Sequence, residues 1–187
     1  EVCRAFAAYY QVPPQDVVAG NGSDELISVI MNAFLQKGEA FATIAPDFSM
    51  YSFYGHLAEA KEIVIPKEEN FQIDIDRVIE TCKNKNVKLL IFSNPCNPTS
   101  LGVSREGIRR LIQQTEAWVV LDEAYMDFWN QSLLAEHAAY DNLIILRTCS
   151  KALASAGLRI GFAVASQPVA DVIRAAKSPY NVNICLL

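Results

Sequence analysis

The chain has 187 residues, of which 51% are hydrophobic and 20% charged, and its formal net charge is −5. This composition is sufficient for one folded domain with a sizeable core. The acidic balance and the lack of any basic run argue against a nucleic-acid partner, because proteins that bind phosphate backbones usually carry a basic patch. No apolar stretch reaches the roughly 20 residues that cross a bilayer, so we expect no membrane association.

Cysteine and histidine usage points away from disulfides and metals. The five cysteines are widely spaced, odd in number and form no CxxC pair, and the two histidines lack the spacing of a ligand pair. Neither a disulfide framework nor a zinc site is indicated. We therefore expect no metal and a reducing, cytoplasmic location.

Apolar periodicity predicts helices and strands that alternate along the chain. In chain order the pattern predicts helical spacing in 1–10, a strand at 17–19, a helix at 23–36, a strand at 40–45, a helix at 49–58, a strand at 61–66, a helix at 74–83, a strand at 87–93, a helix at 104–115, an apolar run ending in carboxylates at 118–125, strands at 142–148 and 159–165, and a helix at 168–177. Several strands are continuously apolar, which is typical of a mainly parallel sheet covered on both faces. The predicted fold class is α/β, a three-layer α/β/α sandwich.

Polar residues follow several of the predicted strands. Asn94 and Asn97, then Asp122, then Lys151 come directly after apolar strand segments. In open α/β sheets, ligands bind beyond the carboxyl ends of the strands. We therefore expect these residues to be neighbours in space.

The segment GNGSDEL at 20–26 places two glycines ahead of Ser23 and Asp24 at the start of a helix. Free backbone N–H groups at such a helix start, together with the helix dipole, favour an anion such as phosphate. An ordinary glycine turn with a serine cap is the alternative. Arg159 would bind a phosphate bidentately unless it forms a surface ion pair, and the hydroxyls of Thr148 and Ser150 would fill the remaining oxygens.

Asp122 and Lys151 carry the remaining chemistry. Asp122 follows apolar strand residues and needs a partner, which could be backbone N–H groups, a protonated ring nitrogen or, with Glu123, a metal lacking further evident ligands. Lys151 lies among small and hydroxyl-bearing residues, which indicates a pocket lysine. A lysine, a phosphate site, an aspartate for a ring nitrogen, and Asn97 and Tyr125 for a phenolate oxygen are together the groups that bind pyridoxal phosphate.

The sequence resembles the fold-type I pyridoxal-phosphate enzymes, and within them the histidinol-phosphate aminotransferase group. The strings that carry the resemblance are NGSDE (21–25), PDFSMY (46–51), SNPCNPT (93–99), LDEAYMDF (121–128), RTCSKALASAGLRIG (147–161) and PYNVN (179–183). The resemblance implies that 1–187 is the pyridoxal-phosphate-binding large domain of a homodimeric enzyme. It also implies that the family's N-terminal arm and small C-terminal domain, which carries the carboxylate-binding arginine, are absent.

The resemblance also implies a role for each matching residue. Lys151 forms the Schiff base with the cofactor and moves a proton between the substrate and the cofactor. Asp122 keeps the ring nitrogen protonated, Asn97 and Tyr125 bond the ring oxygen, and Phe48 stacks on the ring. The implied phosphate ligands are Ser23, Asp24, Thr148, Ser150 and Arg159.

Two positions depart from the pattern of the group. Ser100 stands where a glycine usually follows Asn-Pro-Thr, so we expect a distorted turn that affects the aim of Asn97. Phe48 replaces a tyrosine, so a hydroxyl bond is lost while stacking remains.

The activity implied is transfer of an amino group between an amino acid or amino-alcohol phosphate, with L-histidinol phosphate favoured, and 2-oxoglutarate. A threonine-phosphate decarboxylase shares nearly every motif and is the first alternative, with aspartate and aromatic aminotransferases more distant. An inactive cofactor-binding fragment is the alternative outside the enzyme class. A nucleotide-binding module is disfavoured, because GNGSDE lacks both the GxGxxG and the GK[ST] pattern.

Overall fold

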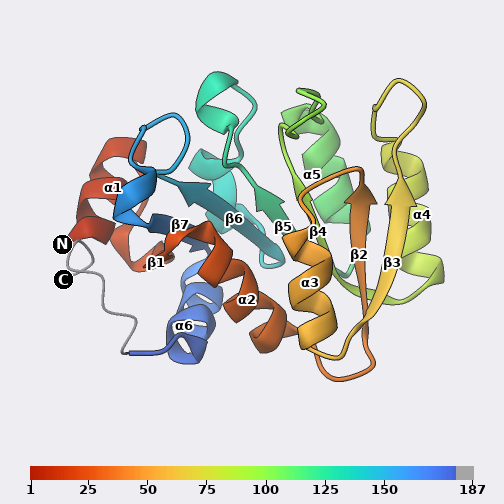
Figure 1. The fold of residues 1–187 in the computed structure, drawn as a ribbon, viewed down its shortest axis with the longest axis horizontal. Coiled ribbons are helices and arrows are strands. Elements are labelled where there is room, and N and C mark those ends of the chain that lie inside the picture. The colour runs from red at the N-terminus through yellow and green to blue at the C-terminus, as the bar shows by residue number, and fades with distance from the viewer. Residues whose placement is uncertain (180–187) are drawn as a thin grey trace.

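The computed structural model describes residues 1–179, which form a sheet between two layers of helices (Figure 1). The sheet has seven strands in the order β1-β7-β6-β5-β4-β2-β3. The strands are β1 (Val17–Asn21), β2 (Ala40–Ala45), β3 (Lys61–Pro66), β4 (Val87–Ser93), β5 (Trp118–Asp122), β6 (Leu143–Thr148) and β7 (Ile160–Ala165). Strand β7 pairs antiparallel with both β1 and β6, and the other pairings are parallel, so the predicted mainly parallel sheet is confirmed.

The helices divide between the two faces of the sheet. The helices are α1 (Val2–Tyr10), α2 (Gly22–Phe34), α3 (Met50–Leu57), α4 (Ile75–Asn84), α5 (Arg105–Gln114) and α6 (Gln167–Ala176). Helices α1, α4 and α5 cover one face, and α2, α3 and α6 cover the other (Figure 1). The predicted three-layer α/β/α sandwich is therefore confirmed.

Strand β4 shows why the central strands are apolar without interruption. Leu90 and Phe92 lie in the core beneath α1, α4 and α5, whereas Leu89 and Ile91 lie in the core beneath α2 and α3. All four side chains are fully buried. Because both faces are covered, each of these four consecutive positions contributes apolar burial, and they show no alternation with polar residues.

Side-chain caps fix the starts of the helices α4 and α5. The carboxylate of Asp74 accepts hydrogen bonds from the backbone N–H groups of Asp76 and Arg77, at 3.0 and 3.2 Å. The hydroxyl of Ser104 accepts from Gly107 N–H at 3.3 Å, so α5 begins with a serine cap. Each cap satisfies donors that the first helical turn leaves unpaired.

The topology brings residues that follow several different strands together at one edge of the sheet. The carboxyl ends of β1, β2, β4, β5 and β6 share that edge, since these strands run in the same direction. Strand β7 runs the opposite way, so its beginning lies at the same edge. Arg159, which directly precedes β7, is thereby brought beside residues that follow the other strands. The antiparallel direction of β7 is a feature that the sequence pattern did not specify.

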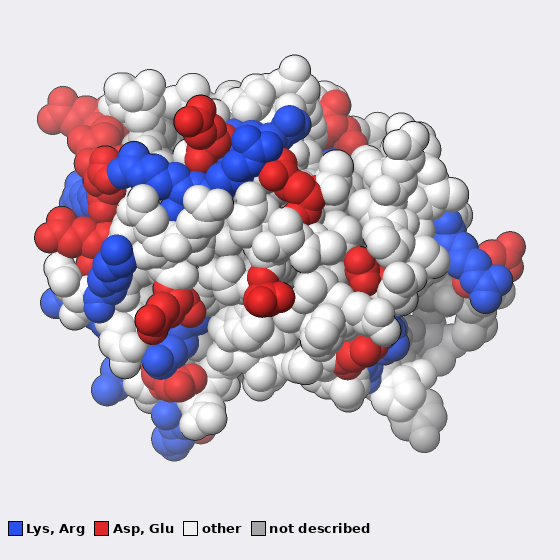
Figure 2. Space-filling view, turned by 180° about the vertical axis from the view of Figure 1, so that it is seen from behind, with Lys and Arg blue, Asp and Glu red and all other residues white. Residues whose placement is uncertain are grey.

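Charges of both signs are mixed on the face that carries α4 and α5 (Figure 2). On α5, Arg109 pairs with Glu136 at 2.8 Å, and Arg110 pairs with Asp76 of α4. Such surface pairs contribute about 0–1 kcal/mol each and form no broad field of one sign. Within residues 1–179, none of the helices has the length and apolar character needed to span a bilayer.

Candidate active site

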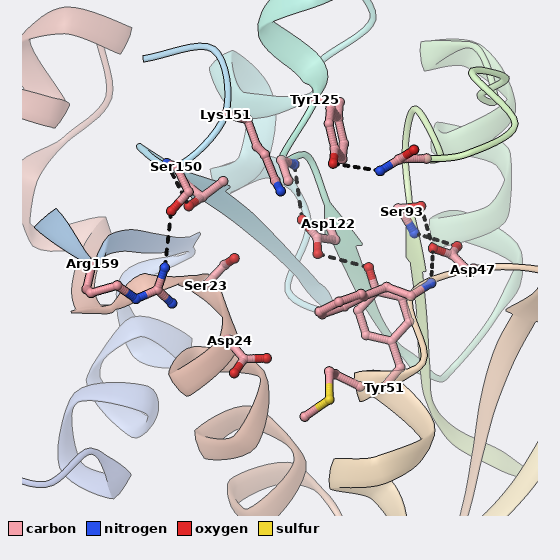
Figure 3. Close-up of a pocket in the computed structure, with 15 residues that line it drawn as sticks. Ser23, Asp24, Asp47, Tyr51, Ser93, Asp122, Tyr125, Ser150, Lys151 and Arg159 are labelled. Atoms are coloured by element: carbon pink, nitrogen blue, oxygen red, sulfur yellow. Dashed lines mark hydrogen bonds between the residues drawn. The ribbon is translucent and has the colours of Figure 1, made fainter. Parts of the chain in front are cut away.

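One cavity of about 410 Å³ lies at the shared strand edge (Figure 3). All of the residues that the sequence predicted for the site line this cavity: Ser23, Asp24, Phe48, Asn97, Asp122, Tyr125, Thr148, Ser150, Lys151 and Arg159. The chain separates the first and last of them by more than a hundred residues. The fold thus brings the predicted site residues together.

Asp122 ends β5 and is buried, with 5% of its surface exposed. Its Oδ1 accepts a hydrogen bond from Ala124 N–H at 3.0 Å, and its Oδ2 accepts one from the hydroxyl of Tyr51 at 2.9 Å. Burial raises the pKa of this carboxyl from 3.8 to about 6, although both hydrogen bonds act in the opposite direction. A positive group placed against Asp122 would favour its ionised form.

Tyr51, Asp47 and Ser93 line the same cavity and were not predicted. Tyr51 lies on α3 and is 1% exposed, and burial raises the pKa of its phenol well above the usual 10. The carboxylate of Asp47 accepts hydrogen bonds from both the backbone N–H and the hydroxyl of Ser93. A buried tyrosine hydroxyl needs a partner, but the burial of Tyr51 depends on how α3 packs, so no local sequence signal identified it.

Asn97 and Tyr125 meet across the cavity, as their predicted common role requires. The amide nitrogen of Asn97 donates to the hydroxyl of Tyr125 at 2.8 Å. Ser100 adopts a positive φ of 58°, the left-handed conformation that glycine accepts most readily. The turn nevertheless closes, because Ser100 N–H donates to the carbonyl of Cys96 at 2.7 Å. Asn97 still reaches the cavity, so the serine has not removed it from the site.

The start of α2 forms the other end of the cavity. Gly22 has a positive φ of 83°, and a Cβ there would lie 2.7 Å from a guanidinium nitrogen of Arg159. A Cβ on Gly161 of β7 would lie 2.2 Å from the backbone nitrogen of Ser23. Both glycines are therefore needed for the close approach of β7 and Arg159 to the helix N-terminus. This arrangement gives backbone donors, a guanidinium and hydroxyls facing one space, which suits an anion.

Hydrogen bonds join several side chains at this anion end. A guanidinium nitrogen of Arg159 donates to the hydroxyl of Ser150 at 3.4 Å, and Ser150 N–H donates to the Thr148 hydroxyl at 3.2 Å. The Asp24 carboxylate accepts from the hydroxyl of Tyr54 at 2.9 Å, so this side chain is engaged by α3. For Asp24, the backbone is the part available to an anion.

Lys151 lines the cavity but is exposed, as is Arg159. The sequence predicts a pocket lysine, and the position of Lys151 in the cavity lining agrees with that prediction. The Lys151 Nζ lies 5.4 Å from the ring centroid of Tyr125, which places it above the Asn97–Tyr125 pair. Phe48, also half exposed, lies at the cavity margin.

Glu123, next to Asp122, points to the other side of the chain. Its carboxylate lies 3.0 Å from Nε of buried Arg147 and accepts a hydrogen bond from the Ser132 hydroxyl at 2.6 Å. The two adjacent acids therefore face different environments, and a joint metal site is not formed. Of the motif PYNVN, residues 180–183 lie outside the described residues, and its contribution stays a prediction.

Comparison with known proteins identifies the family of the chain. The family described as aminotransferase class I and II matches residues 1–187, and the chain belongs to this family. Histidinol-phosphate aminotransferases of Clostridium kluyveri and Clostridium novyi are 42% and 41% identical over 183 and 180 residues. These matches cover 98% and 96% of the chain but 52% and 51% of the relatives. The chain thus spans about half the length of the curated relatives that it matches.

Solved structures show the same fold at lower identity. Histidinol-phosphate aminotransferase from Sinorhizobium meliloti, solved in complex with pyridoxal-5'-phosphate, has a TM-score of 0.91 and is 21% identical. The match covers 97% of this chain and 50% of that structure's chain. L-threonine-O-3-phosphate decarboxylase from Porphyromonas gingivalis has a TM-score of 0.82 and is 24% identical. The match covers 97% of this chain and 54% of the decarboxylase. These similarities confirm the fold class.

Proposed function

We propose that this chain is the cofactor-binding large domain of a pyridoxal-phosphate-dependent aminotransferase. The observation that carries the proposal is the convergence of an anion end, a buried carboxylate and a lysine on one cavity. The proposed amino donor is L-histidinol phosphate and the proposed acceptor is 2-oxoglutarate. The relatives of 41–42% identity named histidinol-phosphate aminotransferase support this choice of donor.

The residues present fit this cofactor. Its phosphate suits the space between the α2 N-terminus and Arg159, where Gly22 and Gly161 have no Cβ that would crowd the cradle. Its ring nitrogen, when protonated, suits Asp122, whose burial leaves the carboxylate in need of a positive partner. Its ring oxygen suits the amide and hydroxyl of the paired Asn97 and Tyr125. When bound, the cofactor supplies an electron sink for the bonds to the substrate α-carbon.

Other residues of the chain would bind the anion, set the charge of the ring nitrogen and move the proton. The Arg159 guanidinium and the helix N-terminus hold the anion, and Phe48 provides an aromatic face at the cavity margin. Asp122, fixed by two hydrogen bonds, holds a proton on the ring nitrogen through its negative charge. The Lys151 amine would hold the cofactor and, when free, would move a proton at the substrate α-carbon.

The test is covalent capture of pyridoxal phosphate. We expect the purified protein with added cofactor to absorb in the near-visible range, and borohydride reduction followed by peptide mapping to place the adduct on Lys151. Lys151→Ala should lose this adduct, whereas Lys83→Ala, which changes an exposed lysine on α4 outside the cavity, should keep it. An adduct spread over surface lysines would contradict the proposal and favour an inactive fragment.

The donor is tested on protein that forms the Lys151 adduct. We expect histidinol phosphate to bleach the cofactor absorbance through transfer of its amino group, with recovery on addition of 2-oxoglutarate. Threonine phosphate is the comparison substrate, because a decarboxylase of this fold would release carbon dioxide from it. Release of carbon dioxide without bleaching by histidinol phosphate would replace the aminotransferase by the decarboxylase.

The proposal includes a homodimer in the cytoplasm, as the family pattern implies. Sedimentation at several protein concentrations tests the dimer, with a species of twice the chain mass expected. A monomer that still forms the Lys151 adduct would separate cofactor binding from assembly.

A further inference from the structure

We propose that Tyr51 is a positioning residue that sets the orientation and charge of Asp122 for the ring nitrogen of the bound cofactor. This inference rests on the proposed function and adds a residue to its site. Tyr51 lies on α3, and its hydroxyl reaches Asp122 at the end of β5 (Figure 3). The two residues are 71 positions apart in the chain.

Two hydrogen-bond donors fix the carboxylate of Asp122, and Tyr51 supplies one of them. Ala124 N–H occupies Oδ1 and the Tyr51 hydroxyl occupies Oδ2, so the two donors fix the plane of the carboxylate from two sides. The backbone donor, Ala124, belongs to the turn that directly follows β5 and would persist without Tyr51. The tyrosine is therefore the side-chain contact that keeps Oδ2 from turning within the cavity.

The hydroxyl also favours the ionised form of Asp122. A hydrogen bond to a carboxylate stabilises the charged state, and the nearby Lys151 acts in the same direction. Burial and the negative Asp47 act against it, raising the pKa of Asp122. Tyr51 remains a phenol donor throughout, because burial and the two aspartates raise its own pKa, with Cys96 adding to that effect. Loss of the hydroxyl should therefore leave Asp122 neutral up to a higher pH.

The surroundings of Tyr51 indicate that its ring could be kept while the hydroxyl is removed. The side chain is fully buried in the core beneath α2 and α3, and its ring meets that of Phe48 edge to face, with centroids 5.5 Å apart. Phenylalanine retains this ring and its burial. Tyr51→Phe thus isolates the hydrogen bond from the packing.

The experiment measures the dissociation constant of pyridoxal phosphate against pH for wild type, Tyr51→Phe and Tyr10→Phe. Tyr10 is the matched control, because its hydroxyl donates to the Asp127 carboxylate at 2.8 Å outside the cavity. We expect roughly tenfold weaker binding for Tyr51→Phe, the scale of one hydrogen bond to a charged group. We also expect the pH at which binding fails to move upward, whereas Tyr10→Phe should leave that pH unchanged.

A double-mutant cycle with Asp122→Asn tests whether Tyr51 acts through Asp122. In the Asp122→Asn background, Tyr51→Phe should weaken cofactor binding no further. An additive loss, or an unmoved pH profile in the single variant, would overturn the inference while leaving the proposed function intact. Wild-type protein that forms no adduct on Lys151 would overturn both, so the two failures are distinguishable.

Discussion

At one end of the cavity Asp122 and Tyr51 are buried and hydrogen-bonded to each other, whereas at the other end Lys151 and Arg159 are exposed on turns. The buried end is held by the strand β5 and the helix α3, through the hydrogen bonds of Asp122 to Tyr51 and to Ala124 N–H. At the exposed end, a guanidinium nitrogen of Arg159 donates to the Ser150 hydroxyl at 3.4 Å. Under the proposed function, the fold would preorganise the carboxylate that faces the ring nitrogen, and the anion contacts would tighten on binding.

The largest effect should come from Asp122→Asn, which removes the charge and keeps the shape. Removing one partner of a buried charge pair costs about 2–5 kcal/mol, so we expect cofactor affinity to fall on the order of 100-fold. Titration of the cofactor absorbance measures this change. An Asn variant with wild-type affinity would show that the buried end does not dominate binding, and the comparison would fail.

The second effect is on the stability of the cofactor-free protein. The pKa of Asp122 is raised from 3.8 to about 6, so the folded protein binds the proton more tightly than the unfolded chain. Between about pH 4 and pH 6 the free energy of unfolding should therefore fall as pH rises, by about 3 kcal/mol from this group at most. Asp122→Asn should lack this loss.

Denaturant unfolding of wild type and Asp122→Asn at several pH values measures that difference. The other carboxyl groups are common to both proteins and cancel in the comparison. We expect the Asn variant to gain stability relative to wild type as the pH rises through this window. A difference that is constant with pH would mean that Asp122 is not strained by burial.

The third effect tests the exposed end through Arg159→Ala. A hydrogen bond to a charged group contributes about 1.5–3 kcal/mol, and exposure reduces this, so we expect roughly tenfold weaker binding of pyridoxal phosphate. Pyridoxal without phosphate should bind both proteins equally. Arg110→Ala, which removes an exposed guanidinium from α5, should leave both affinities unchanged. Equal losses for the two ligands would remove Arg159 from the anion site.

The two ends also differ in what the sequence could predict. Local apolar patterns specify each strand and helix, and the rule that ligands bind at strand ends was enough to select Asp122, Asn97 and Lys151. The contact of Tyr51 with Asp122 depends on how α3 packs across the sheet, and no local pattern encodes it. Lys151 was selected correctly as a pocket residue, but the exposed fraction of its side chain is a tertiary property that no local pattern encodes.

The smallest effect concerns Ser100, where the sequence departs from its group. The left-handed conformation costs a residue with a Cβ about 1–2 kcal/mol. Glycine avoids this cost but loses about 0.5–1 kcal/mol more in chain entropy on folding. Ser100→Gly should therefore stabilise the protein by less than about 1 kcal/mol, which raises Tm by about 2–4 °C at most for a chain of this size. Ser100→Ala should give no gain, because alanine keeps the Cβ at the φ of 58°.

Cofactor affinity decides what the Ser100 turn does to the site. Asn97 already meets Tyr125 at 2.8 Å with the serine in place, so the turn presents the amide correctly. We therefore expect Ser100→Gly to raise Tm in a thermal melt and to leave the dissociation constant of pyridoxal phosphate unchanged. A gain in affinity together with Tm would mean that the serine misaligns Asn97, and the buried end would then be less completely preorganised than its hydrogen bonds indicate.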